Sequence, residues 1–173
     1  MSPIEAFERA VAAPGTDAGA ICAALHRLAD ALVGARLFTL MAFDGATREA
    51  SRVYTSDPVA YPVSGTKPAP ENAWSARVLD RRETFVANDL AGIAAVFPDH
   101  ALIDSLGCRA VLNLPIVLGG RVLGTVNCLD RAGRYTPARV AAARALRLPG
   151  TVAFLARVPD RPPRLGAPAR ARW

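Results

Sequence analysis

The sequence lacks the features that would place it in a membrane, in an oxidising compartment or around a structural metal. None of its apolar runs approaches the ~20 residues that a membrane-spanning helix needs. Its first fifteen positions carry charged side chains where a secretion signal has an apolar core, so we expect them to belong to the mature protein. Cysteine occurs only as Cys22, Cys108 and Cys128. This odd count, without a Cys-x-x-Cys pair, excludes a disulfide framework and a cysteine metal site, and it favours a cytoplasmic location.

Several catalytic signatures are also absent. No segment matches GxxxxGK[ST], HExxH or GxSxG, so nucleotide hydrolysis, zinc proteolysis and serine-esterase chemistry have no support. The two histidines, His26 and His100, have no second ligand at metal spacing. We therefore expect both to be surface residues, and we predict no metal site.

Little of the net positive charge lies outside the C-terminal tail. Residues 157–173 hold five arginines against Asp160, a balance of +4 within the net charge of +6, so the other 156 residues carry +2. Lysine occurs once, as Lys67. This distribution predicts a solvated, disordered Arg/Pro-rich tail at 158–173 rather than a phosphate-binding surface. Nucleic acid is not the expected partner.

What the sequence does contain is a pattern of helices and strands that suits about one domain. An N-terminal helix is expected within residues 1–16 and the main domain over 17–157. The elements expected in the main domain are, in order, a helix at 17–33, strands at 36–44 and 49–56, a loop at 57–70, a short helix capped by Asn72, a strand at 84–87, short helices over 88–106, a hairpin over 107–130, and a helix at 137–156 interrupted at Pro149-Gly150.

This order of elements predicts an α+β fold with three layers. Consecutive strands joined by tight turns imply a central antiparallel sheet, of five to six strands. We expect the first, second and last helices to cover one face of the sheet. The short middle helices and loop 57–70 would cover the other face only loosely, and a loosely covered face is where a cavity forms.

The hairpin carries one asparagine in each strand, Asn113 and Asn127. A two-residue turn at Gly119-Gly120 would place Asn113 opposite Val126 and split the amides between the two faces. A three-residue loop with Gly120 in the left-handed region would place both amides on one face. We predict the three-residue loop, with both amides in a pocket wall; the alternative is that they bond to nearby loop backbone and touch no ligand.

Two segments carry a resemblance to a known family. The hairpin "SLGCRAVLNLPIVLGGRVLGTVNCLD" and the segment "TFVANDLAGI" resemble the core of GAF domains, and the resemblance extends over residues 17–157. It implies a sensory module that binds a small molecule and signals through a partner protein or a homodimer. Helices 17–33 and 137–156 would form the dimer surfaces. The chain leaves no room for an output domain, so we expect a stand-alone module.

The pocket candidates are aromatic, hydroxyl, amide and acidic side chains that this arrangement brings toward the loosely covered face. They are Tyr54, Ser56, Tyr61, Trp74, Val78, Asp89, Phe97, Asn113, Thr125 and Asn127. Trp74 and Phe97 could equally be core residues, and Asp89 is better explained as a helix cap. Such a lining suits a small neutral or weakly polar metabolite, for instance an aromatic one. No particular cofactor is predicted, because the motifs of tetrapyrrole-binding and cyclic-nucleotide-binding GAF domains are absent.

Two other functions stay open. One GAF branch, the free methionine-(R)-sulfoxide reductase, uses a cysteine near the position of Cys108. The acids expected in that branch fall here at Val111, Asn127 and Leu129, and no resolving cysteine is evident, so we predict that the chain is not an enzyme. The third possibility is a degenerate GAF scaffold that only mediates protein contacts.

Overall fold

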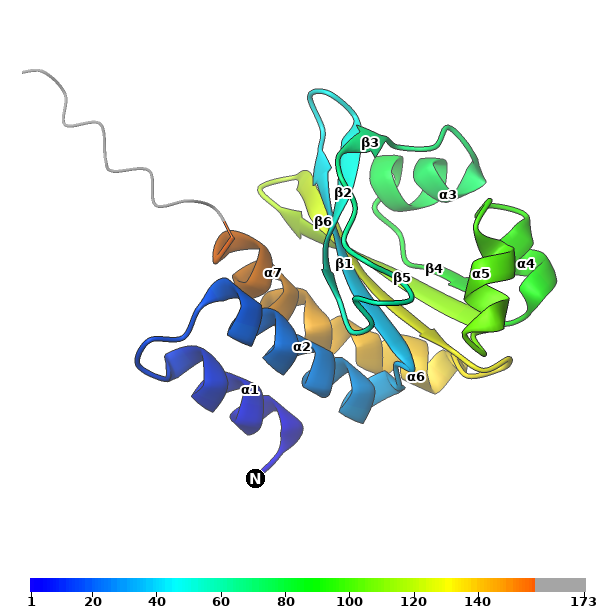
Figure 1. Cartoon of the computed structure of the whole chain (residues 1–173). Coiled ribbons are helices and arrows are strands. Elements are labelled where there is room, and N and C mark those ends of the chain that lie inside the picture. Colours follow the sequence, from blue (N-terminus) through cyan, green and yellow to red (C-terminus); the bar gives the residue numbers. More distant parts are fainter. Residues whose placement is uncertain (158–173) are drawn as a thin grey trace, which may run out of the picture.

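A six-stranded antiparallel sheet forms the centre of the molecule, in a computed structural model that describes residues 1–157. The strand order is β3-β2-β1-β6-β5-β4 (Figure 1). The strands are β1 (Leu37–Asp44), β2 (Glu49–Thr55), β3 (Lys67–Pro68), β4 (Phe85–Ala87), β5 (Ala110–Leu118) and β6 (Arg121–Asp130). The predicted α+β class and the central antiparallel sheet are confirmed. The Arg/Pro-rich tail predicted at 158–173 lies outside the described residues.

The helices begin and end close to the positions that their capping residues indicate. They are α1 (Pro3–Ala12), α2 (Ala18–Val33), α3 (Ala73–Ser75) with a π-helical turn (Ala76–Asp80), α4 (Leu90–Ala94), α5 (His100–Ser105), α6 (Pro137–Ala142) and α7 (Arg147–Leu155). Ser2 and Glu5 form a capping box on α1, and the Asp17 side chain accepts a hydrogen bond from the first turn of α2. Among residues 1–157, no helix is long and apolar enough to cross a membrane.

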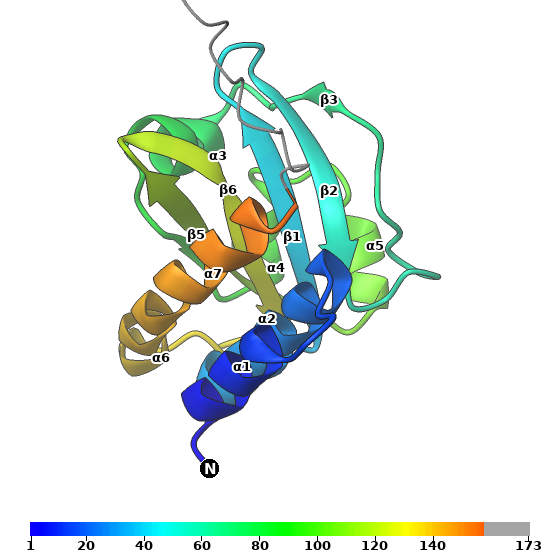
Figure 2. The same ribbon diagram turned by 90° about the vertical axis from the view of Figure 1, so that its left-hand side faces the viewer.

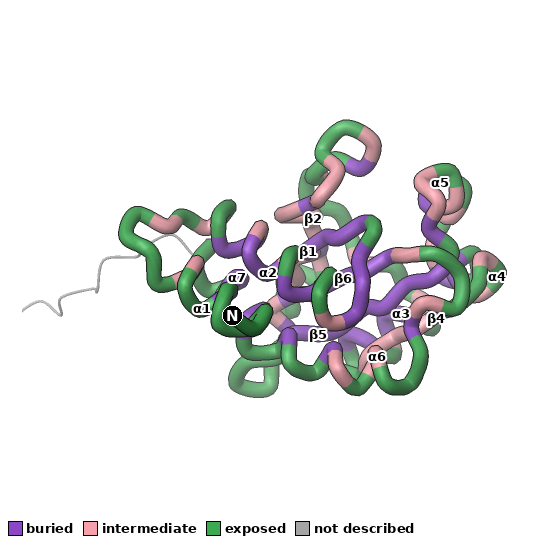
Figure 3. The backbone as a smooth tube through the Cα atoms, turned by 90° about the horizontal axis from the view of Figure 1, so that it is seen from below, coloured by how far each residue is buried: buried purple, intermediate pink, exposed green. Residues whose placement is uncertain are grey.

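Helices α2 and α7 cover one face of the sheet, and α6 packs against α2 in the same layer (Figure 2). Leu25 and Leu28 of α2 and Leu146 pack in one buried cluster with Phe38 and Leu112 of the strands. Figure 3 shows the buried residues running along β1, β5 and β6. The first helix departs from the prediction: α1 packs mainly against α2 rather than on the sheet. Its Phe7 reaches the same buried cluster, so α1 thickens this layer instead of widening it.

The last helical segment is divided, as predicted, but the division precedes Pro149-Gly150, and both of these residues lie inside α7. A 3₁₀ segment (Ala143–Leu146) separates α6 from α7, and Pro149 lies inside α7, where its missing N–H removes the bond that Ala145 would otherwise accept. Gly150 is needed for close packing, because a Cβ there would lie 2.7 Å from Cδ1 of Ile116 in β5. The small residue therefore lets α7 lie directly on the sheet.

The hairpin turn is not the predicted three-residue loop. Leu118 pairs with Arg121, which leaves a two-residue turn, and Gly119 and Gly120 both have positive φ, at 57° and 75°. Both values lie in the left-handed region, as a type I′ turn requires, and the Gly-Gly pair meets that requirement at no steric cost.

A β-bulge next to this turn restores the pairing that the prediction needed. Val117 pairs with Val122 but Ile116 pairs with Gly124, so Leu123 is an extra residue in β6. The extra residue shifts the register by one, and Asn113 lies directly opposite Asn127. The prediction that both amides share a face is confirmed, although the predicted loop that was to produce it is wrong.

Candidate functional site

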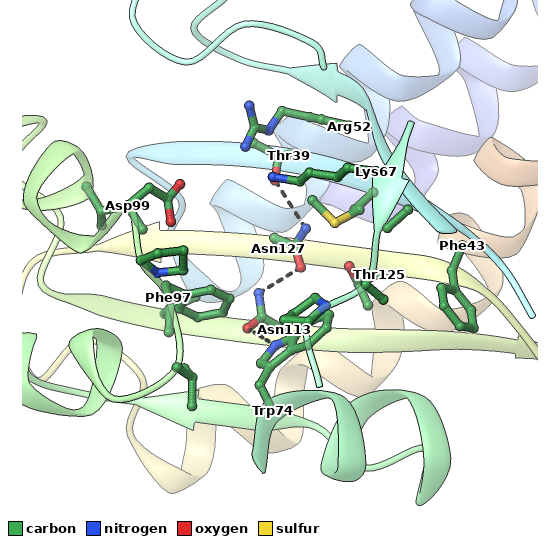
Figure 4. A pocket seen from close by; sticks show the side chains of 18 of the residues that line it. Thr39, Phe43, Arg52, Lys67, Trp74, Phe97, Asp99, Asn113, Thr125 and Asn127 are labelled. Carbon is green, nitrogen blue, oxygen red and sulfur yellow. Dashed lines mark hydrogen bonds between the residues drawn. The ribbon is translucent and has the colours of Figure 1, made fainter. Parts of the chain in front are cut away.

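The second face of the sheet is hollow. Between it and the covering segments lies a cavity of about 360 Å³, within the range typical of small-molecule sites. Strands β1, β2, β5 and β6 form its floor, and loop 57–70, α3 and residues 96–99 form its walls (Figure 4). The lining is mainly apolar and aromatic, with a few polar side chains from the strands. The sheet therefore has one sealed face and one loosely covered face, as the sequence predicted.

Strand register arranges the polar floor residues in a row. Thr39 of β1 pairs with Asn127 of β6, which pairs with Asn113 of β5, so three polar side chains stand side by side on the cavity face. Asn113 is 4% and Asn127 is 7% exposed. Amides this deeply buried need partners, because an unpaired buried amide costs about 1–3 kcal/mol.

A continuous hydrogen-bond chain supplies these partners. Trp74 Nε1 donates to Asn113 Oδ1 at 2.9 Å, Asn113 Nδ2 donates to Asn127 Oδ1 at 2.7 Å, and Asn127 Nδ2 donates to Thr39 Oγ1 at 3.1 Å (Figure 4). The amides therefore bond to other side chains. The alternative, in which they bond to loop backbone, does not hold. The chain fastens the indole of Trp74 to the sheet and so fixes one wall of the cavity.

Six of the ten predicted pocket residues line the cavity. They are Tyr61, Trp74, Phe97, Asn113, Thr125 and Asn127. Trp74 and Phe97 meet edge to face, with ring centroids 6.0 Å apart. The two aromatic rings form part of the wall and also pack against core residues, so both of the roles considered for them are filled.

Tyr54 and Ser56 do not line the cavity, because β2 contains a bulge of its own. Arg52 pairs with Met41 but Tyr54 pairs with Leu40, so the register shifts at Val53 and Tyr54 turns to the helical face. There its ring packs against Phe38, with centroids 6.0 Å apart. Ser56 Oγ accepts a hydrogen bond from the backbone N–H of Phe38 at 2.9 Å and closes the end of the β1–β2 ladder.

Val78 and Asp89 also lie away from the cavity. Val78 is fully buried with Leu79 and Val122, where it anchors the π-helical turn on the sheet. Asp89 Oδ1 accepts a hydrogen bond from the N–H of Gly92 at 2.7 Å and caps α4, as the capping explanation predicts. Their assignment to the pocket is therefore corrected.

The prediction missed the three charged residues of the lining, Arg52, Lys67 and Asp99. Arg52 faces the cavity because it pairs with Met41, in the register that the β1–β2 turn sets and before the bulge. Lys67 belongs to a two-residue strand inside the predicted loop. Asp99 lies directly before α5 and makes no side-chain cap on it. The one signal in the sequence was that Lys67 is the only lysine.

Tyr61 ties the loop over the cavity to the opposite wall. Its hydroxyl donates to Asp99 Oδ2 at 2.5 Å, and the Arg52 guanidinium carbon lies 3.7 Å from the centre of its ring. Burial and the hydrogen bond to Asp99 raise the pKa of Tyr61, so the phenol stays protonated and donates. Arg52 Nη1 also donates to the carbonyl of Pro62 at 2.6 Å. The loop is therefore held closed over the cavity.

Two buried side-chain polar atoms have no hydrogen-bond partner among residues 1–157: Arg52 Nε and Thr125 Oγ1. Both residues line the cavity, and Thr125 is only 2% exposed. Such atoms are rare in folded proteins, because each loses its hydration without compensation. Both atoms therefore belong to side chains of the cavity lining and are not satisfied by the described residues.

The cysteines lie outside the cavity. All three are fully buried, and Cys108 Sγ contacts only the Leu106 carbonyl as a polar neighbour, at 3.9 Å. Burial raises the pKa of the Cys108 thiol to about 11. Within the described part of the chain, no three His, Cys, Asp or Glu side chains are grouped as a metal site would require. His26, expected at the surface, is half-buried and stacks on Phe38, with ring centroids 5.0 Å apart.

The fold has relatives among solved structures. A GAF domain/HD domain protein from Geobacter sulfurreducens is 18% identical with a TM-score of 0.64, over 83% of this chain and 95% of that one. The chromophore-binding domain of an unusual bacteriophytochrome from R. palustris is 15% identical with a TM-score of 0.61, over 88% and 59% of the two chains. The free methionine-R-sulfoxide reductase from Neisseria meningitidis, in complex with its substrate, is 17% identical with a TM-score of 0.61, over 89% of each chain.

No curated protein matches the sequence. Similarities at these identities establish the fold alone. The sequence itself matches the family model described as "GAF domain" over residues 17–147. This match covers most of the chain, and it agrees with the antiparallel sheet and the hollow face. The chain belongs to the GAF domain family.

Proposed function

We propose that this GAF domain is a sensory module that binds a small molecule in the cavity of about 360 Å³ on the open face of its sheet. The observation that carries the proposal is the pair of unpartnered polar atoms, Arg52 Nε and Thr125 Oγ1, in that cavity. A hollow that served only as a packing defect would be lined by apolar groups. Two proteins of the same fold are described with small molecules, one as a chromophore-binding domain and one with its substrate.

A thiol-based reductase acting through Cys108 is the alternative raised by the sequence, and one structural relative is such an enzyme. Attack by a cysteine requires an exposed thiolate. Cys108 is fully buried, its pKa is raised to about 11 by burial, and it is not part of the cavity lining. These observations favour binding over catalysis. A purely structural scaffold is disfavoured by the cavity itself.

Occupancy of the cavity would be passed on through a homodimer or a partner protein, and α7 offers the surface for it. Leu148, Val152 and Leu155 are 79%, 36% and 47% exposed, and their spacing places them along one side of the helix. On α2, the other predicted dimer helix, α1 already covers part of the surface. The buried free cysteines suit the predicted cytoplasmic location.

A thermal-shift screen of a metabolite collection tests the proposal. The natural protein is compared with a variant whose cavity is filled, Met41→Trp, because Met41 lies on the cavity floor. We expect at least one compound to raise the melting temperature of the natural protein and to leave that of the folded variant unchanged. Equal shifts for both proteins, or no shift for the natural protein by any compound, would refute a ligand site in this cavity.

A further inference from the structure

We infer that the ligand is a small planar aromatic carboxylate whose acid group binds Arg52 and whose far end reaches Thr125. This inference rests on the proposed function and names the chemical class of the ligand. It departs from the neutral ligand expected from the sequence, because the predicted lining did not include Arg52 or Lys67.

The charge of the lining favours an anion. Among the residues that line the cavity, the charged ones are Arg52, Lys67 and Asp99, which sum to +1. The carboxylate of Asp99 already accepts the hydroxyl of Tyr61. The two cations therefore face the cavity without an acid committed to either of them in the described part of the chain.

Arg52 is held in place with one edge of its guanidinium unused. Nη1 donates to the carbonyl oxygen of Pro62 at 2.6 Å, and the guanidinium carbon lies 3.7 Å from the centre of the Tyr61 ring. Nε is buried and has no partner among residues 1–157. Because the guanidinium is planar, a carboxylate can dock on the edge that carries Nε with two parallel hydrogen bonds. A group already fixed by two other contacts loses little freedom when it binds.

Thr125 marks the far end of the site. Arg52 of β2 and Thr125 of β6 both pair with Met41 of β1, so the three stand in one row across the floor. Strands lie about 4.8 Å apart, which separates the Cα atoms of Arg52 and Thr125 by roughly 10 Å. The two side chains therefore stand on either side of Met41, on the cavity face of the sheet. The Thr125 hydroxyl, buried without a partner, would then bond to a polar substituent at the end of the ligand opposite its carboxylate.

The shape of the cavity favours a flat body. Trp74 Nε1 donates to Asn113 Oδ1 at 2.9 Å, and the ring of Phe97 packs edge to face with the indole of Trp74. Fixed aromatic walls of this kind receive a planar ring by stacking or by edge contact. Figure 4 shows these two rings along one side of the cavity and Arg52 on the opposite side of the Asn113–Asn127 row. The apolar body and the acid group of the ligand therefore have separate places.

Isothermal titration with four probes tests the inference: 4-hydroxybenzoate, benzoate, 4-hydroxybenzamide and phenyl phosphate. We expect 4-hydroxybenzoate to bind best and its amide at least about tenfold more weakly, since a charge-assisted hydrogen bond is lost. Arg52→Gln is expected to weaken binding of both acids by about 10- to 100-fold and to leave binding of the amide unchanged. Thr125→Val is expected to weaken 4-hydroxybenzoate but not benzoate. Arg121→Gln, an exposed arginine at the start of β6, is the control and changes nothing.

The outcomes separate this inference from the proposed function. If the amide binds as tightly as the acid, or Arg52→Gln binds both alike, or phenyl phosphate binds best, the carboxylate assignment is overturned while the cavity still binds ligands. If none of the four probes binds, the aromatic carboxylate is also overturned, and the metabolite screen decides the proposed function independently. Circular dichroism and thermal melting establish that each variant is folded, so a loss of binding by an unfolded variant is not counted.

Discussion

Replacement of Asn113 by leucine removes the centre of the buried hydrogen-bond chain and keeps the side-chain volume nearly constant. It leaves Trp74 Nε1, in a residue that is 5% exposed, without an acceptor, and it leaves Asn127 Oδ1 without a donor. Each unpaired buried group costs about 1–3 kcal/mol, and the added apolar surface offsets part of the sum. We expect a net destabilisation of about 2–4 kcal/mol, which lowers the melting temperature of a chain this long by about 4–16 °C.

Urea unfolding followed by circular dichroism measures this change, and Asn127→Leu with the double variant completes a cycle. In the double variant the pair is removed together, so its cost should fall below the sum of the single costs by about 1–3 kcal/mol. Trp74 fluorescence, recorded in a Trp173→Phe background, should report the loss of the indole hydrogen bond. A single variant within about 0.5 kcal/mol of the natural protein, the size of a neutral surface change, would refute a structural role for the chain of amides.

Three further predictions follow from buried thiols and the exposed side of α7. Thiol reagents should leave Cys22, Cys108 and Cys128 unmodified in the native protein and modify all of them after unfolding, because each is fully buried; rapid native labelling of Cys108 would contradict this. Burial raises the pKa of the Cys108 thiol from about 9 to about 11, so its contribution to stability is present below pH 9 and is lost as pH rises to 11. Cys108→Ala should therefore flatten the decline of the unfolding free energy, measured in urea, between pH 9 and 11. An equal slope for both proteins would contradict this. In sedimentation analysis the natural protein and Arg121→Gln should both be dimers and the double substitution Leu148→Arg and Leu155→Arg a monomer; a monomeric natural protein or an unchanged dimer would contradict α7 as the interface.

The sequence was sufficient to predict the features of the fold that depend on residues close together in the chain. The helix ends at Ser2, Asp17 and Gly34 could be read directly, because a cap satisfies backbone groups within one turn. The sealed face could also be predicted, since alternation of apolar residues along the hairpin determines which side packs under helices. These parts of the fold need no knowledge of distant pairing.

Two of the errors come from strand pairing at a distance. The extra residues Val53 and Leu123 are bulges that exist only relative to a partner strand, and no local pattern announces them. One bulge turned Tyr54 away from the cavity, while Arg52 lies before that bulge and faces the cavity in the regular register. The other rescued the pairing of the asparagines from an incorrectly predicted turn. Lys67 and Asp99 lie outside the long strands, where no alternation of side chains indicates that they line the cavity.

A crystal structure of the protein, from crystals grown with 4-hydroxybenzoate, tests the central claim that the cavity on the open face of the sheet binds a small molecule. The account predicts one planar molecule in the cavity of about 360 Å³, with its carboxylate on Arg52 and its hydroxyl at Thr125. A cavity closed by Trp74 and Phe97 themselves, with the Thr125 hydroxyl bonded within the protein, would contradict it.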